Sequence, residues 1–195
     1  MSMMSIGTYP RTIESGSGQR MTFLGLGPDG AMEVESDILP GAGPQLHSHP
    51  HQRESVMVIE GEIACAGAHG PERRATVGES VAFEPGVPHR FWNPGSNTLR
   101  IRGRIHPPMR FEWFMTLLYA SMSANGGRPG LFDVAYLARH FADEGTMDGL
   151  PALVRRVVLP AAYVIGSATG RYAQFDNVPP SARSGDVVRS PHRGL

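Results

Sequence analysis

Short runs of alternating apolar and polar residues fill the first half of the chain. They include MTFLGLG at 21–27, AMEVESDIL at 31–39 and TLRIRGRI at 98–105, and Gly or Pro separates one run from the next. Alternation places successive side chains on opposite faces of a strand, and many short strands divided by turn residues are typical of a sandwich or barrel. The region from Thr8 to Pro107 is therefore predicted to be all β.

The apolar spacing changes to three and four residues after position 110, which predicts helices. One helix is expected in RFEWFMTLLYASMSANGG at 110–127 and a second in LFDVAYLARHFADEG at 131–145. A third carries an apolar stripe from Leu150 to Ile165, with Pro160 in its interior. Proline removes one backbone hydrogen bond, so this helix is predicted to form two linked pieces.

The chain divides on these patterns into a barrel at 1–110, a helical extension at 111–176 and a polar, Pro-rich tail at 177–195 that is expected to be loosely ordered. The helix expected at 110–127 is apolar nearly all round, so it needs covering by the barrel or by a second subunit. We favour a homodimer; the alternative is that the helices cover only their own barrel.

The composition of the chain limits the classes of molecule that it is expected to bind. The 195 residues suffice for one core, and the 18 basic residues balance the 18 acidic ones, which argues against binding to nucleic acid or an anionic membrane. We expect a small-molecule ligand or another protein as partner. No signal-peptide core or membrane-length apolar run is found, which favours a cytoplasmic protein. Cys65 is the only cysteine and is expected to be a small buried residue, so any metal site here uses imidazole and carboxylate ligands.

Such ligands occur in GAGPQLHSHPHQRESVMVIEG at 41–61. Residues two apart on a strand face the same way, so His47 and His49 are predicted to project together from one strand. After the turn at Pro50, Glu54 begins a new strand and shares its face with Val56. Two imidazoles and a carboxylate can therefore converge from adjacent strands.

A fourth ligand is expected from GESVAFEPGVPHRFWN at 78–93, in which His89 follows the turn EPGVP and shares its face with Phe91. Three imidazoles and one carboxylate leave one or two coordination positions open on a metal ion. The sequence therefore predicts one divalent transition metal, Fe, Mn, Ni or Zn, on His47, His49, Glu54 and His89.

The spacing of these residues resembles the two motifs of the cupin superfamily. The first runs from Gly41 through His47, His49 and Glu54 to Gly61, and the second from Gly78 to Asn93, with Glu84 where that motif usually has proline. The resemblance covers residues 8 to 107. It implies a mainly β fold, a double-stranded β-helix with the metal inside the barrel, followed here by a helical C-terminal extension.

Several neighbouring residues have two interpretations. His51 repeats the two-residue spacing and is a rival ligand, although its separation from Glu54 favours a place at the rim of the site. The arginines of LRIRGRIH at 99–106 are expected on the outer face; if they pointed inward they would suit an anionic substrate. Candidate pocket residues, which are equally consistent with ordinary core positions, are Gln45, His51, Val56, Phe83 and Phe91.

The donor set favours a metal-dependent dioxygenase that acts on a small aromatic, enol or diketone-type substrate, because the open positions accept substrate and oxygen together. It resembles the donor set of the quercetin dioxygenase-like and acireductone dioxygenase-like cupins, and Glu54 would then also act as a catalytic base. The alternatives are a metal-dependent isomerase, decarboxylase or hydrolase, and a non-catalytic ligand-binding cupin.

Overall fold

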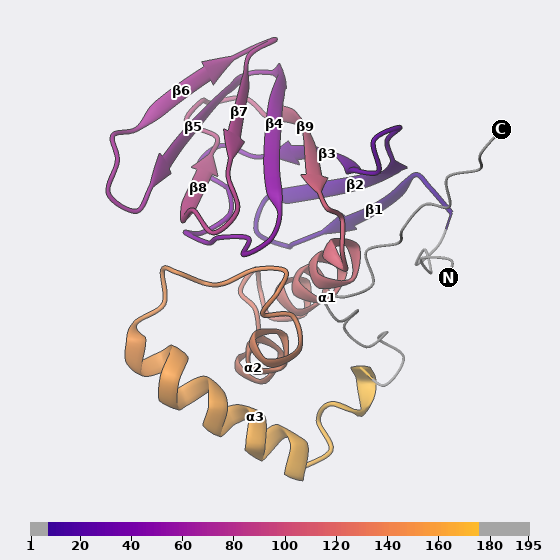
Figure 1. Ribbon diagram of the computed structural model, residues 1–195, viewed down its shortest axis with the longest axis vertical. Coiled ribbons are helices and arrows are strands. Elements are labelled where there is room, and N and C mark those ends of the chain that lie inside the picture. Colours follow the sequence, from indigo (N-terminus) through magenta and orange to yellow (C-terminus); the bar gives the residue numbers. More distant parts are fainter. Residues whose placement is uncertain (1–7, 176–195) are drawn as a thin grey trace, which may run out of the picture.

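The computed structural model describes residues 8–175, which form a β-barrel with a layer of helices across one end (Figure 1). Within these residues nine strands form a six-stranded sheet, ordered β1-β2-β3-β9-β4-β7, and a three-stranded sheet, ordered β6-β5-β8. The pairings between these strands are antiparallel. The strands are β1 (Arg11–Glu14), β2 (Gln19–Leu26), β3 (Met32–Ile38), β4 (Arg53–Glu60), β5 (Glu62–Gly67), β6 (Arg73–Thr76), β7 (Ser80–Phe83), β8 (His89–Trp92) and β9 (Leu99–His106).

The alternating pattern of the sequence decides which side chains enter the barrel. Every second residue of β3 and β9 is buried, and the core between the two sheets includes Val56, Ile63 and Phe91. Gly103 of β9 lies opposite Val34 in β3, where an added Cβ would come within 2.9 Å of the valine side chain. The predicted all-β region is therefore confirmed, with its core on the expected faces.

Two of the strands, β1 and β6, were not predicted. Each is four residues long, lies at the edge of its sheet and carries charged side chains. Short polar edge strands give little alternation to detect, since one side of the strand faces solvent and its partner supplies the hydrogen bonds.

The arginines of β9 lie on the outer face of the sheet, as predicted, and ion pairs to β3 and its preceding turn hold them there. Because they point away from the barrel interior, the alternative of an arginine-lined anionic site is wrong. The closest pairs are Arg100–Glu35 at 2.9 Å, Arg102–Glu33 at 2.7 Å and Arg104–Asp29 at 2.6 Å.

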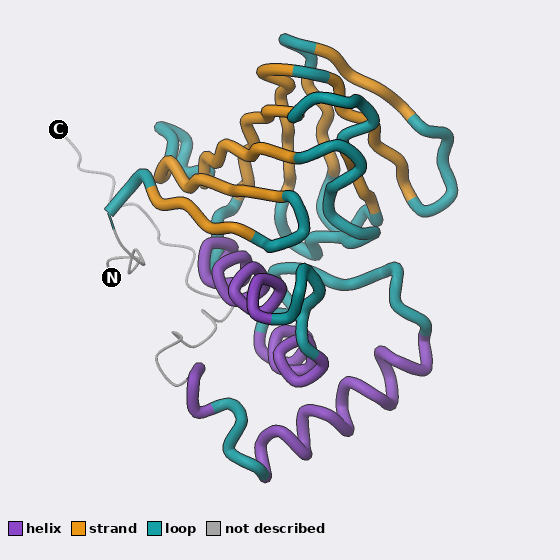
Figure 2. Tube along the Cα trace, turned by 180° about the vertical axis from the view of Figure 1, so that it is seen from behind, coloured by secondary structure: helices purple, strands orange, loops and turns teal. Residues whose placement is uncertain are grey.

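The helices α1 (Phe111–Ala124) and α2 (Leu131–His140) lie beneath the barrel, and α3 (Leu159–Ala168) lies farthest from it (Figure 2). Two short elements flank α3: the π-helical η1 (Val154–Val158) and the 3-10 helix η2 (Ala173–Phe175). Phe111 and Tyr119 of α1 pack against Phe23 and Ile105 of the barrel. The other side of α1 packs against α2, where Phe141 is fully buried.

This packing explains the nearly uniform apolar character of α1, because barrel and α2 cover it within one chain. The boundary predicted at 110 coincides with the residue before α1. The tail predicted at 177–195 lies outside the described residues.

The third predicted helix consists of the π-helical η1 joined directly to the α-helical α3, which agrees with the expectation of two linked pieces. A π turn stands directly before Pro160, and the N–H of Leu159 donates to the carbonyl of Val154. The wider turn changes which positions face inward. Leu159 and Ala162 are consequently buried, whereas much of the predicted stripe is exposed, including Leu153, Val157, Val158 and Ile165.

Among residues 8–175, none of the helices combines the length and the apolar character needed to cross a bilayer.

Candidate metal centre

Glu54 stands near the start of β4, with its side chain directed into the barrel. It pairs with Phe83 of β7 on one side and Ile105 of β9 on the other. Val56 and Val58 are buried on the same face, as the alternation predicts. The carboxylate therefore enters an apolar interior, where an ionised group needs polar partners.

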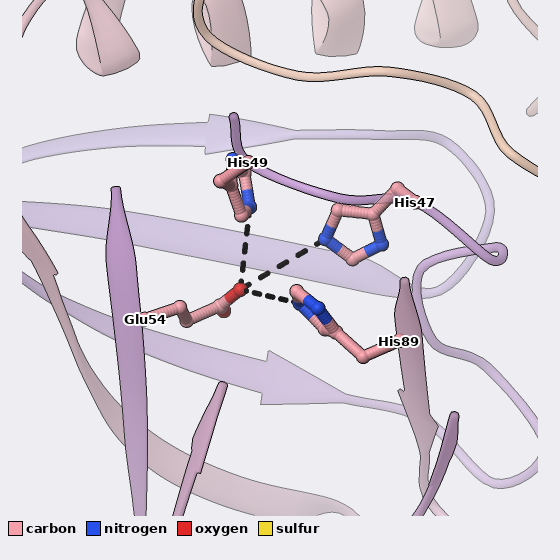
Figure 3. A group of neighbouring side chains, drawn as sticks. All are labelled: His47, His49, Glu54 and His89. Carbon is pink, nitrogen blue, oxygen red and sulfur yellow. Dashed lines mark hydrogen bonds and ion pairs between the residues drawn. The ribbon is translucent and has the colours of Figure 1, made fainter. Parts of the chain in front are cut away.

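The three imidazoles are those partners. His47 and His49 come from the segment between β3 and β4, and His89 opens β8. The backbones of His47 and His89 exchange two hydrogen bonds, at 2.9 and 2.8 Å. Figure 3 shows all three rings directed at the Glu54 carboxylate. The structure thus brings together the four residues that the sequence placed in one site.

One detail of the prediction is wrong: His47 and His49 do not lie on a regular strand. Each side of this segment makes only an isolated bridge, His47 with His89 and Ser48 with Thr146. The backbone N–H and C=O of Ser48 face Thr146 of the helical extension, so a continuous ladder with the barrel is not formed. The segment remains extended, and residues two apart still share a side.

Glycine allows this segment to approach β8 closely. A Cβ on Gly43 would lie 2.1 Å from the carbonyl oxygen of Phe91. Such a contact is impossible for any other residue without moving the backbone, so Gly43 fixes the course of the chain into the histidine pair.

The four side chains meet within a small volume. One ligand atom from each residue lies within 4.8 Å of the others. From Glu54 Oε2, the distance to Nε2 is 3.0 Å for His89, 3.3 Å for His49 and 3.8 Å for His47. Three nitrogens and one oxygen at this separation have the composition and proximity of a transition-metal site.

Each imidazole is oriented by its second ring nitrogen. The Nδ1 atoms contact backbone carbonyls: Gln45 O at 2.8 Å for His47, Glu144 O at 2.6 Å for His49, and Val87 O at 2.9 Å for His89. A proton on Nδ1 that donates to a carbonyl leaves the lone pair on Nε2. All three Nε2 atoms face the cluster, so the donors fit a metal ion.

The pKa values of the cluster follow from these contacts. Burial alone would raise the pKa of Glu54, but contacts from His47, His49 and His89 outweigh burial and hold it well below its usual range. Burial acts to lower the pKa of His49, yet the Glu54 carboxylate and the Glu144 carbonyl raise it overall. Metal-free protein therefore keeps an ionised carboxylate surrounded by imidazoles.

Comparison with known protein families supports the same interpretation. The family model described as "Cupin domain" matches residues 34–102, which include all four residues of the cluster. Residues 34–102 form a cupin domain. The cupin double-stranded β-helix predicted from the two motifs is thus confirmed for the barrel. A search of curated proteins found no match for the chain.

Several solved structures resemble part of this chain. A sugar phosphate isomerase from a cupin superfamily, from Silicibacter pomeroyi, is 26% identical over 47% of this chain and 60% of its own length, with a TM-score of 0.41. A Klebsiella pneumoniae protein with a double-stranded β-helix domain is 20% identical over 52% and 82% of the two chains, with a TM-score of 0.41. KdgF from Halomonas sp. is 18% identical over 53% and 92%, with a TM-score of 0.45.

The candidate pocket residues separate into two groups. Phe83 stacks on the His89 ring with centroids 4.0 Å apart, and Phe91 stacks on Phe83 at 6.2 Å. Both aromatic rings and Val56 belong to the barrel core. Gln45 is exposed and contributes its carbonyl to His47, not its side chain. Cys65 is a buried free thiol of that core, as predicted.

His51 is not part of the cluster. Its side chain is exposed, and its Nε2 lies 4.0 Å from Asp143 of the helical extension. This position matches the expected place at the rim and removes the rival ligand that the repeated spacing suggested.

Sequence reasoning missed three residues beside the cluster, all from the helical extension. The centroid of the Phe111 ring lies 6.2 Å from that of the His49 ring, and Glu144 holds His49 through its carbonyl. Tyr119 is almost fully buried; burial, and next the charge of Glu54, raise the pKa of its hydroxyl. None belongs to a motif, because their proximity arises only from folding of the extension against the barrel.

Proposed function

We propose that this chain is a metal-dependent dioxygenase of the cupin family, with one divalent transition metal on His47, His49, Glu54 and His89. The observation that carries the proposal is the oriented donor set: three Nε2 atoms and one carboxylate oxygen gathered within 4.8 Å, with each Nδ1 engaged by a carbonyl. Such a set suits Fe, Mn or Ni, and these ions accept substrate and oxygen together.

The surroundings of the cluster favour a neutral, flat substrate. Phe83 and Phe91 form an aromatic stack that begins at the His89 ring. Arg100, Arg102 and Arg104 face outward in ion pairs, so β9 offers the site no cation for a phosphate or carboxylate. An aromatic, enol or diketone-type molecule matches an apolar wall beside a metal.

In this reaction the bound metal would supply the position at which substrate and oxygen meet. The protein would fix the three imidazoles and exclude water with the apolar wall. Glu54, once released from the metal, would take a substrate proton on its carboxylate oxygen. Because the histidine contacts lower the pKa of Glu54, the metal-free site presents the carboxylate in its ionised form.

The proposal is tested by metal analysis followed by oxygen uptake. Purified protein is stripped, reloaded separately with Fe(II), Mn(II), Ni(II) or Zn(II), and assayed with phenolic and diketone substrates in an oxygen electrode. We expect near-stoichiometric binding and substrate-dependent oxygen consumption with Fe, Mn or Ni. Turnover of an added substrate without oxygen use would instead identify a metal-dependent isomerase, decarboxylase or hydrolase, and tight metal binding without turnover a ligand-binding cupin.

A cytoplasmic homodimer remains part of the proposal. Since α1 is covered within one chain, the surface that fits a second copy is the exposed apolar row of η1 and α3. Its large members are Val157, Val158, Val164 and Ile165, together with Leu153 directly before η1. A row of this kind can pair with itself across a two-fold axis, which light scattering on the eluted protein would detect as a doubled mass.

A further inference from the structure

The loop after α2 lies against the metal-ligand segment, although about a hundred residues separate them in the chain. We call residues 144–149 the strap. Ser48 and Thr146 exchange two backbone hydrogen bonds, at 3.2 and 2.9 Å, and the Gly149 N–H donates to Leu46 O at 3.1 Å. The hydroxyl groups of Ser48 and Thr146 also meet at 2.8 Å. The strap therefore pairs with the ligand segment at Ser48, whereas the barrel pairs with the same segment at His47.

Glu144 begins the strap and makes its contact with the cluster. His49 Nδ1 lies 2.6 Å from the Glu144 carbonyl oxygen, and both residues are buried. His47 and His89 are held by carbonyls two residues before them, whereas the acceptor for His49 lies 95 residues away. The barrel alone does not supply the group that orients this ring.

The side chain of Glu144 fixes the position of its own carbonyl. Its side chain is 0% exposed, and its two carboxylate oxygens accept hydrogen bonds from Gln52 Nε2 at 3.0 Å and from the Arg110 N–H at 2.8 Å. Gln52 lies two residues before Glu54, and Arg110 directly precedes α1. A carboxylate at the start of a helix is further stabilised by the helix dipole. Three segments of the chain are thus joined at one buried group.

We propose that the strap is a functional part of the metal centre and that Glu144 is a positioning residue that sets the ring of His49. The Glu144 carbonyl accepts a hydrogen bond from the Nδ1–H of His49. This contact fixes the tautomer and directs Nε2 toward the metal, so the helical extension completes the site. This inference rests on the metal site proposed above and goes beyond it, since it assigns a role to a region outside the cupin domain.

The test compares two buried glutamates of the extension in the full-length protein. Glu144→Ala removes the two side-chain hydrogen bonds, from Gln52 and from the Arg110 N–H, that hold the start of the strap. Glu112→Ala is the matched control, because buried Glu112 also joins the extension to the barrel, through Tyr9 at 2.7 Å and Arg11 at 3.0 Å, and it is not one of the four residues of the cluster. We expect both variants to melt at lower temperature, and only Glu144→Ala to bind Co(II) or Ni(II) about 10- to 100-fold more weakly. The visible spectrum of bound Co(II) should also change only in Glu144→Ala.

A second readout needs no metal. Long-range nitrogen NMR of the metal-free protein, at a pH where the ring is neutral, should place the His49 proton on Nδ1 in the wild type and show a mixed tautomer in Glu144→Ala. If Glu144→Ala does not fold, Thr146→Val removes the hydroxyl contact to Ser48 and should weaken metal binding in the same direction.

Equal metal affinities for the Glu144→Ala, Glu112→Ala and wild-type proteins, with His49 unchanged in the NMR spectrum, would overturn the inference. A wild type that binds no metal would count against the proposed function instead, and the tautomer measurement would still decide whether the strap sets the His49 ring.

Discussion

Two of the three imidazoles are oriented from within the barrel, whereas the third is oriented from the helical extension. His47 and His89 each find a carbonyl two residues back, so a local turn is enough to set their rings. His49 depends on Glu144, which reaches it only when the extension is docked. One donor set can therefore be encoded in a motif while its geometry is shared between two regions.

The two regions also use charge differently. The barrel places its arginines outside, in exposed ion pairs with β3. The extension buries the carboxylates of Glu112 and Glu144, and each accepts hydrogen bonds from elsewhere in the chain. A buried, satisfied carboxylate is costly to disturb, while an exposed pair contributes little.

The largest effect is expected from opening the core of the extension. Phe141 is 0% exposed, with the Arg110 guanidinium 4.2 Å from the centre of its ring. Phe141→Ala should lower the free energy of unfolding by about 3–5 kcal/mol, through lost burial and the cavity left behind. The control is Phe23→Ala, an equally buried ring that packs between the barrel and α1. Urea unfolding in which only Phe141→Ala produces a separate early transition would show that the extension unfolds independently of the barrel.

The second-largest effect is expected from removing one of the four metal-ligand residues. His89→Ala removes a nitrogen donor and leaves the buried Glu54 with one partner fewer, so metal affinity should fall by more than the ~100-fold typical of residues that only orient a ligand. His51→Ala should leave affinity unchanged, because His51 lies at the rim beside Asp143. Calorimetric titration with Ni(II) measures both, and similar losses in the two variants would show that the ligand assignment is wrong.

The pH dependence of metal binding should report the protonation of His49, the imidazole that the extension holds. In metal-free protein the pKa of His49 is raised above 6.5, so below that raised pKa an incoming metal has to displace a proton. The apparent affinity for the metal should be highest above the raised pKa. Below it, the affinity should fall by about tenfold per pH unit for each proton displaced. Titrations between pH 5 and 8, roughly the range in which histidine titrates, measure this slope. An affinity that is flat across this range would contradict the expectation.

The stability of the metal-free protein should fall, whereas metal affinity rises, as the pH increases through the pKa of His49. A raised His49 pKa contributes stability that is complete below pH 6.5 and is lost as the pH rises through the folded value. The lowered pKa of Glu54 contributes stability above pH 4.5 that is lost as the pH falls. The contributions of these two groups are therefore both present between pH 4.5 and 6.5. Melting temperatures with and without metal across this range separate the two trends.

The smallest effect is expected on the outer face of the barrel. Arg102→Ala breaks the 2.7 Å pair with Glu33, yet the pair is partly solvated and should contribute less than about 1 kcal/mol. Metal affinity should not change, because the side chain points away from the cluster. A measurable loss of metal binding in this variant would contradict the outward placement of the strand's arginines.

Much of the site could be predicted from the sequence because strand alternation is a local property. Glu54 with Val56, and His89 with Phe91, share faces that can be assigned from their spacing alone, and the structure keeps both pairs together. The outward arginines of β9 follow from the same rule. The helices α1 and α2 were likewise recognisable from their three- and four-residue spacing.

Other features could not be predicted in this way. The π turn before Pro160 turns Val157 and Ile165 outward, because one added residue in a turn changes every later facing position. The edge strands β1 and β6 are defined by their partners more than by their own residues. No local sequence pattern predicts the π turn or the two edge strands.

The donor set and the barrel can be derived from the sequence alone, since motif spacing and alternation act within a few residues. Three features follow only from the folded chain: the way the His49 ring is held, the cover of α1 within one chain, and the position of Tyr119 near the charge of Glu54. These depend on where the extension docks. Docking is set by the sum of many weak contacts between distant segments, and no short stretch of sequence contains that sum.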